Sequence, residues 1–173
     1  MTNETLNILR DRRSIRKYQP RQISAEELEA VLEAGTWAPS GKNLQTAVMV
    51  VVQDPETIAH MSALNAKIMG ADSDPFFGAP TVVVVLADAT QKNWLQDGSL
   101  VMGNLMTAAA SLGLGSCWVN RAMELFDQPE GKALLAKWGL PETMRGVGNC
   151  VLGYAEGPAP APKPRKEHYV LRV

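Results

Sequence analysis

The stretch between Asp97 and Ser116 contains no Lys, Arg or Glu, although its first part has the length of a long helix. A surface helix carries a charged stripe, so a helix here is predicted to be buried on nearly all sides. Small residues recur at every fourth position and share one face of this helix, namely Ser99, Gly103, Thr107 and Ser111. Such a strip allows a second backbone to approach closely.

Apolar runs without polar alternation predict strands that are covered on both faces. Thr46–Gln53 and Thr81–Ala87 are runs of this kind. Cys117–Val119 predicts a short strand after a left-handed stop at Gly113, and Arg145–Tyr154 predicts the last core strand.

Capping signals and apolar spacing predict further helices. Ser24 and Glu27 form a capping box, and Asp54 precedes a proline at the first helical position. The predicted segments are Asn3–Leu9, Ser24–Gly35, Asp54–Gly70 and Pro129–Trp138, with the long helix beginning as early as Trp94. Mixed helices and strands of this kind predict a sheet covered by helices on both faces.

The C-terminal residues 157–173 form an extended arm. Gly157–Arg165 is rich in proline and is predicted to be polyproline-like, so it is neither helix nor central strand. Tyr169–Val173 has the composition of a strand. A stiff arm that ends in a strand is expected to reach the sheet edge of a second subunit.

Composition narrows the class of protein. A chain of 173 residues is expected to form a single domain, 1–173, and its net charge of −1 argues against a nucleic-acid or anionic-membrane surface. The longest apolar run, Val82–Ala87, is too short for a membrane span, and the N-terminus lacks the apolar region of a signal peptide. Cys117 and Cys150 are interpreted as buried thiols in a reducing cytoplasm. His60 and His168 have no metal-ligand spacing, so no metal site is predicted.

A basic cluster near the N-terminus is the first candidate for chemistry, and it consists of Arg12, Arg13, Ser14 and Arg16. Guanidinium forks and a hydroxyl suit a phosphate or a polar ring edge, and the alternative is a solvated basic turn. Lys163 and Arg165 in the arm have the same two interpretations.

Two polar loops complete the candidates. Pro39–Asn43 follows a helix and Asn120-Arg121 follows a buried strand, and both are also compatible with ordinary connections. The chain has no dinucleotide fingerprint, no Walker loop and no nucleophile elbow, and its two histidines give no support to a triad. If the chain is an enzyme, a cofactor is expected to carry the difficult chemistry.

Taken together and in order, these stretches resemble the FMN-dependent nitroreductase family in its short form. The matching segments are Arg12–Tyr18, Ala38–Gln45, Gly78–Leu86, Leu112–Arg121, Asn149–Gly157 and Lys163–Arg165. The resemblance implies an α+β fold, a three-layer α/β/α sandwich with a mixed, mainly antiparallel sheet. It also implies a homodimer that exchanges C-terminal strands and holds two FMN sites, each built from both chains.

The resemblance also assigns roles to residues. The basic cluster would hold the FMN phosphate, ribityl chain and pyrimidine edge, and Lys163 and Arg165 would come round to the phosphate. The second subunit would place a set of loop residues against the isoalloxazine, namely Pro39, Ser40, Gly41 and Asn43. Backbone groups near Asn120 and Arg121 would face the flavin N5 and O4, and Asn65 would meet the ring edge.

By the same resemblance, a reduced nicotinamide, NADH or NADPH, would pass hydride to flavin N5. A small electron-poor acceptor, such as a nitroaromatic or a quinone, would then take the electrons in a ping-pong sequence. No side chain need act as a nucleophile, so no catalytic residue is predicted. Thr46-Ala47 stands where many members have Pro-Trp, and the lid helices of longer relatives are missing, which predicts an open acceptor pocket. The alternatives are an FMN-binding redox sensor or store with little turnover, and a cofactor-free scaffold.

Overall fold

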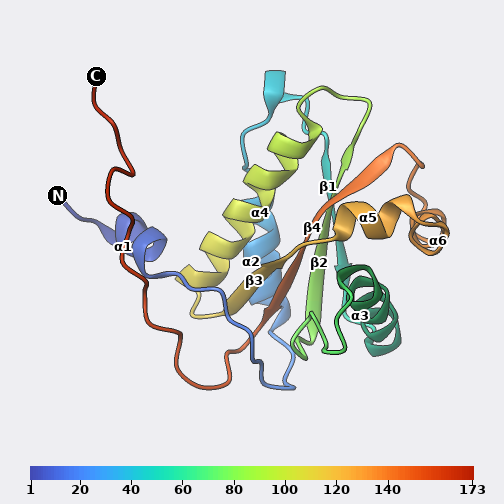
Figure 1. Ribbon diagram of the computed structural model, residues 1–173, viewed down its shortest axis with the longest axis horizontal. Coiled ribbons are helices and arrows are strands. Elements are labelled where there is room, and N and C mark those ends of the chain that lie inside the picture. Colours follow the sequence, from blue (N-terminus) through green and yellow to red (C-terminus); the bar gives the residue numbers. More distant parts are fainter.

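A four-stranded antiparallel sheet lies at the centre of the protein, which is described here by a computed structural model of residues 1–173 (Figure 1). The strand order is β1-β2-β4-β3. The strands are β1 (Ala47–Val52), β2 (Thr81–Asp88), β3 (Gly115–Val119) and β4 (Met144–Gly153). All pairings between these strands are antiparallel, and the isolated bridge between Ser14 and Ser116 is parallel.

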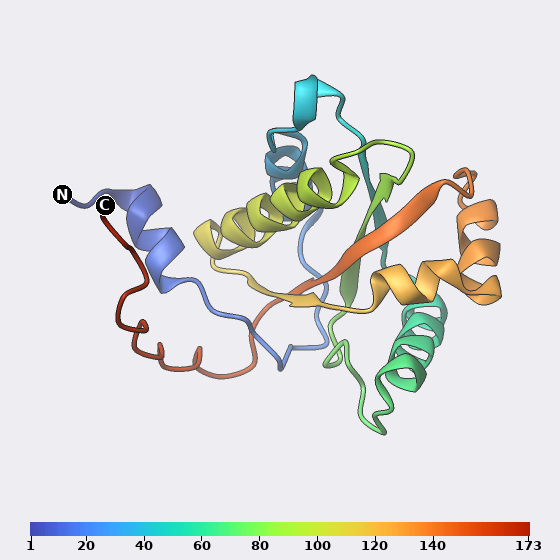
Figure 2. The ribbon, with the colours of Figure 1, turned by 45° about the horizontal axis from the view of Figure 1, so that its top comes forward.

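Helices cover both faces of the sheet, as predicted. Because side chains alternate along a strand, Val82 and Val84 of β2 enter one apolar core while Val83 and Val85 enter the other. The first core is closed by α3 (Pro55–Met69), α5 (Ala122–Asp127) and α6 (Pro129–Lys137). The second core is closed by α2 (Ala25–Thr36) and α4 (Trp94–Ser111), and the layers are visible in Figure 2.

The capping signals of the sequence are confirmed. Ser24 accepts from the backbone of Glu27 while the Glu27 side chain accepts from the backbone of Ser24, and Asp54 caps α3. Gly70 ends α3 in the left-handed region at φ 64°. The short N-terminal helix α1 spans Glu4–Asp11, and its cap is Asn3.

Two predictions of burial are wrong within one chain. The exposed fractions of Leu100 in α4 and of Leu112 directly after it are 45% and 42%, so this helix buries one face instead of nearly all sides. Ala47–Val52 is an edge strand and is only half-buried along most of its length. Both elements therefore expose apolar surface that the single chain does not cover.

One helix of the structure is not predicted from the sequence. The six residues Ala122–Asp127 form α5, which begins directly after Arg121 in the left-handed conformation. A segment of fewer than two turns is too short for apolar periodicity to emerge. The packing of Leu125 and Phe126 into the first core stabilises this short helix.

The C-terminal arm contains neither helix nor strand, and it is exposed from Glu156 to the end. In Figures 1 and 2 it leaves the end of β4 and runs back past the N-terminal segment and α1. Pairing of Tyr169–Val173 with a second subunit stays a prediction. None of the helices combines the length and the apolar character that a bilayer crossing requires.

Candidate functional site

The segment that carries the basic cluster, residues 12–18, is called the basic segment below, and it is fixed against the start of β3. Ser14 bridges Ser116, and the backbone N–H of Ile15 donates to the Ser116 carbonyl at 3.0 Å. A Cβ on Gly115 would lie 3.0 Å from Ile15, which is tighter than an ordinary contact, so the glycine allows this close approach. The buried Tyr18 hydroxyl donates to the Ile15 carbonyl at 2.8 Å. The segment therefore has a defined place beside the C-terminal end of α4.

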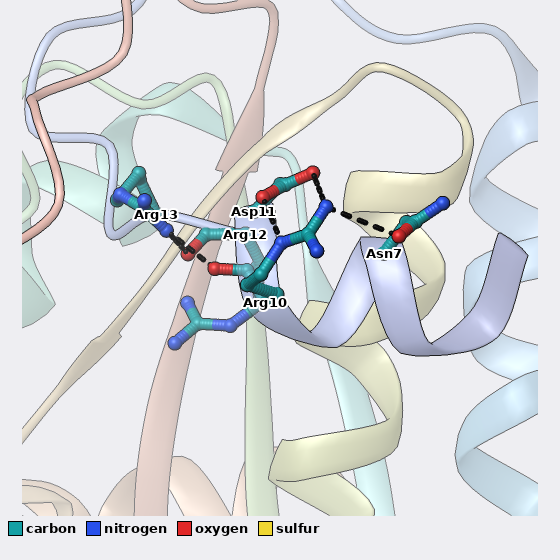
Figure 3. Close-up of polar contacts among 5 residues, drawn as sticks. All are labelled: Asn7, Arg10, Asp11, Arg12 and Arg13. Carbon is teal, nitrogen blue, oxygen red and sulfur yellow. Dashed lines mark hydrogen bonds and ion pairs between the residues drawn. The ribbon is translucent and has the colours of Figure 1, made fainter. Parts of the chain in front are cut away.

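The arginines in and next to this segment differ in their hydrogen-bond partners (Figure 3). Arg13 Nη1 donates to the carbonyls of Arg10 and Arg12, at 2.9 and 2.8 Å, and so caps the C-terminus of α1. Arg10 is bound by Asp11 and Asn7. In contrast, Arg12 Nη1 and Arg13 Nε are buried and have no hydrogen-bond partner. Buried N–H donors of a cation without partners are costly, and an anion would satisfy them.

Three neighbouring cavities connect the predicted residues of this end. Arg12 and Arg13 line a cavity of about 620 Å³ together with α1 and the last residues of α4. Ser14 and Arg16 line a second one of about 270 Å³, beside the start of the arm. Arg16 also lines a third, again of about 270 Å³, together with Asn120 and Arg121. Arg16 lines two of the three cavities. The structure therefore brings six predicted site residues together, namely Arg12, Arg13, Ser14, Arg16, Asn120 and Arg121.

The turn after β3 is held in a rare conformation. Arg121 has φ 76° and ψ 9°, which is uncommon for a residue with a Cβ. Its guanidinium donates to Glu124 at 2.8 Å, and this hydrogen bond lowers the pKa of the Glu124 carboxyl. The side chain of Arg121 is thus engaged along α5, which leaves the turn backbone as its contribution to the cavity.

The loop that contains Pro39–Asn43 lies at the other end of α4, where it includes the 3₁₀ turn η1 (Gly41–Asn43). Asp97, in the first turns of α4, is 5% exposed and accepts from the backbone of Gly41 at 2.9 Å. It also accepts from the Thr46 hydroxyl at 3.2 Å. Thr46 is the residue that the family resemblance aligns with a proline of many members, and here it helps Asp97 to fix the loop.

This loop is strained, because Lys42, Asn43 and Gln45 all have φ between 51° and 54°. Each such residue costs about 1–3 kcal/mol unless local contacts compensate. The sequence analysis did not identify Asp97 as part of the site. The available signal was an acid, Asp97, in a helix that has no other charged residue.

The two halves of the predicted site are far apart in one chain. The 18 residues of α4 extend about 27 Å at 1.5 Å per residue. Figures 1 and 2 show η1 at one end of this helix and α1 at the other. The loop residues Pro39, Ser40, Gly41 and Asn43 therefore do not meet the basic segment of their own chain.

Three predicted residues do not join either half. Asn65 is fully buried on the core side of α3, and it does not line the cavity of Arg16. Its Nδ2 contacts the Met69 sulfur at 3.5 Å while its Oδ1 has no partner. Its place four residues after Met61 puts it on the face that packs on the sheet, which sequence spacing alone did not reveal. Lys163 and Arg165 lie in the exposed arm, and their place at a phosphate stays a prediction.

Comparison with known proteins identifies the family. The model of the nitroreductase family matches residues 9–154. The chain belongs to the nitroreductase family. A relative from Archaeoglobus fulgidus, provisionally named an NADH dehydrogenase/NAD(P)H nitroreductase, is 35% identical over 172 residues, which cover 96% of this chain and 90% of the relative.

Solved nitroreductases share the fold. One from Bacteroides fragilis, determined with bound FMN, superposes with a TM-score of 0.91 at 31% identity and covers 99% of this chain and 100% of the other. Another from Desulfitobacterium hafniense, also with bound FMN, has a TM-score of 0.89 at 28% identity and full coverage of both chains. The resemblance to the nitroreductase family and the α+β sandwich predicted from it are confirmed.

Proposed function

We propose that this nitroreductase-family protein is an FMN-dependent NAD(P)H oxidoreductase that reduces small electron-poor acceptors such as nitroaromatics and quinones. The family and its FMN-bound structures support the class of enzyme and the cofactor. The observation in this chain that carries the proposal is the pair of buried donors without partners, Arg12 Nη1 and Arg13 Nε. Since the FMN phosphate brings a charge of about −1.5 to −2, it is the anion that fits them.

The residues of the basic end would hold FMN by its charged and polar groups. Arg12, Arg13 and Ser14 offer donors to the phosphate, and Lys163 and Arg165 of the arm reinforce them. Arg16 lines two of the cavities and would reach the pyrimidine edge. A cation at that edge stabilises negative charge there and so raises the reduction potential of the cofactor. The backbone at Asn120 and Arg121 offers polar groups to the same ring.

When bound, FMN supplies the chemistry by accepting hydride at N5 from NADH or NADPH and returning the electrons to the acceptor. The chain contributes binding, orientation and charge, and no side chain needs to act as a nucleophile. Donor and acceptor occupy the same place in turn, which is a ping-pong order. The resemblance implies that the lid helices of longer relatives are missing, which would leave this place open to compact acceptors of more than one kind.

A homodimer completes the site. Since the Pro39–Asn43 loop and the basic segment lie at opposite ends of α4, a two-fold axis near the middle of this helix would bring the loop of one subunit to the basic segment of the other. The apolar residues that would be covered include Trp37 and Leu44, which are 78% and 55% exposed. Exchange of Tyr169–Val173 between subunits would cover the exposed edge of β1.

A matched pair of variants tests the cofactor assignment. Arg12→Ala removes a guanidinium with a free buried donor, whereas Arg10→Ala removes a neighbouring guanidinium that is already bound by Asp11. A hydrogen bond to a charged group is worth about 1.5–3 kcal/mol, so the FMN dissociation constant should rise about 10- to 100-fold for Arg12→Ala. For Arg10→Ala it should change less than about 2-fold.

Anaerobic stopped-flow mixing tests the activity. The purified protein should be yellow with about one FMN per chain, and NADH or NADPH should bleach the flavin within seconds. A flavin that binds but is not reduced would identify a sensor or store instead of an enzyme. Equal FMN affinity of the two arginine variants, or protein that takes up no FMN, would contradict the assignment.

A further inference from the structure

The loop between α3 and β2 is held by a single carboxylate, that of Asp74. One oxygen accepts from the Ser62 hydroxyl at 2.5 Å and from the Phe76 backbone at 2.8 Å, and the other accepts from the Gly78 backbone at 2.6 Å. Ser62 lies on α3, twelve residues earlier in the chain. Asp74 therefore ties the loop both to itself and to a helix of the first core.

These hydrogen bonds fix two adjacent phenylalanines that differ in burial and in backbone conformation. Phe76 is fully buried and anchors the loop in the first core. Phe77 has φ 58°, which is a rare conformation for a bulky side chain, and it is only partly buried. Such a conformation persists only where the surroundings fix it, and it occurs often at functional sites. The contacts of Asp74 on both sides of Phe77 supply that constraint.

Phe77 lines the same cavity as the candidate flavin-binding residues. Met69, Pro75 and Phe77 contribute apolar surface to the cavity of about 270 Å³ that Arg16, Asn120 and Arg121 also line. One cavity thus combines a cationic and polar part from the basic segment and the turn after β3 with an apolar part from the loop. The polar part would suit the flavin, and the apolar part would suit an aromatic molecule that lies beside it.

We propose that Phe77 determines acceptor specificity by stacking on planar aromatic acceptors, and that Asp74 is a positioning residue that holds Phe77 in place. This inference rests on the proposed function, because selection of an acceptor requires a reduced flavin. Aromatic rings gain attraction from offset or edge-to-face contact beyond the area that they bury. A two-ring quinone therefore benefits from Phe77, whereas a hydrophilic inorganic oxidant such as ferricyanide does not.

The test compares these two acceptors across variants, at saturating NADH or NADPH. Phe77→Ala should raise KM for a two-ring quinone about 3- to 10-fold, the range that aromatic contact supplies, with little change for ferricyanide. Phe77→Tyr should restore the quinone KM because it restores the ring. Asp74→Ala should shift the quinone KM in the same direction as Phe77→Ala, since the loop loses all three hydrogen bonds.

The matched control is Asp72→Ala, which removes an exposed acid from the same loop and should leave both KM values unchanged. An equal rise in KM for both acceptors after Phe77→Ala would overturn the proposal, as would a weaker FMN affinity with an unchanged ratio of KM values. In either case Phe77 would serve the flavin or the fold. Failure of the proposed function is distinct, because the wild-type flavin would then not be reduced by NADH or NADPH, and this inference would fail with it.

Discussion

Replacement of Gly103 by leucine tests whether two copies of α4 meet at their strip of small residues. Gly103 lies on the same helix face as Ser99 and Thr107, and a Cβ on it would have no atom within 4 Å in the same chain. A single chain therefore has free space where the side chain of this residue would begin. Leucine is also a better helix former than glycine by roughly 0.6–0.8 kcal/mol, so the isolated subunit should lose no stability.

The dimer should respond in the opposite direction. A large side chain forced into a packed interface costs about 1–3 kcal/mol, and a two-fold axis inserts it twice. The expected loss is about 2–6 kcal/mol, which raises the dimer dissociation constant about 30-fold or more. Sedimentation velocity over a dilution series measures this constant directly. At protein concentrations near the raised dissociation constant, the thermal midpoint of the variant should also lie below that of the wild type, because association then stabilises the folded subunit less.

Gly98 provides the control, because a Cβ there would lie 2.5 Å from Val147 within the same chain. Gly98→Ala should lower the thermal midpoint at every concentration and leave the subunit interface intact. If Gly103→Leu left the dissociation constant unchanged, α4 would not be the interface. The shared construction of the site would then lose its geometric basis.

Three further predictions concern charge and burial. Arg16→Glu should raise the FMN dissociation constant at least about 10-fold, whereas Lys137→Glu, at an exposed position, should not. Equal FMN dissociation constants for the two variants would show that Arg16 does not bind the cofactor. Burial raises the pKa of the Cys150 thiol to about 12, so a thiol reagent at about pH 8 should modify it only after unfolding; modification of the native protein would contradict this. The hydrogen bond from Arg145 holds the pKa of the Asp127 carboxyl below its usual value; the resulting stabilisation of the fold is present above that usual value and is lost as the pH falls through the lowered pKa. Asp127→Asn should therefore lower the thermal midpoint slightly at about pH 7, since the two side chains are partly exposed, and this difference should shrink as the pH falls through the lowered pKa; a difference that stays the same at acidic and neutral pH would refute the linkage.

The sequence predicts best those elements whose signals are local. The capping residues Ser24 and Asp54 and the uninterrupted apolar run of β2 act within their own segments, and the structure confirms all three. The burial of α4 and β1 was predicted for surfaces that a single chain leaves exposed. An apolar pattern predicts that a surface is buried, but it does not indicate whether the same chain or a partner subunit buries it.

The candidate site divides in the same way. The basic segment and the turn at Asn120 were identified from residue types, and the structure brings them to adjoining cavities. Asp97 and Asp74, which hold the loops, were not identified. Asp97 accepts from the backbone of Gly41, and Asp74 accepts from the Ser62 hydroxyl on α3. Partners that are distant in the sequence become visible only once the chain is folded.

The length of α4 has a consequence for mixtures of defective subunits. In the proposed homodimer, Arg16 lies near one end of α4 and the Pro39–Asn43 loop near the other, so a subunit damaged at Arg16 would still contribute an intact loop to the site of its partner. A mixed dimer of an Arg16 variant and a loop variant would contain one wild-type site and one doubly damaged site. Random reassortment of two inactive proteins should therefore restore about a quarter of the full complement of working sites.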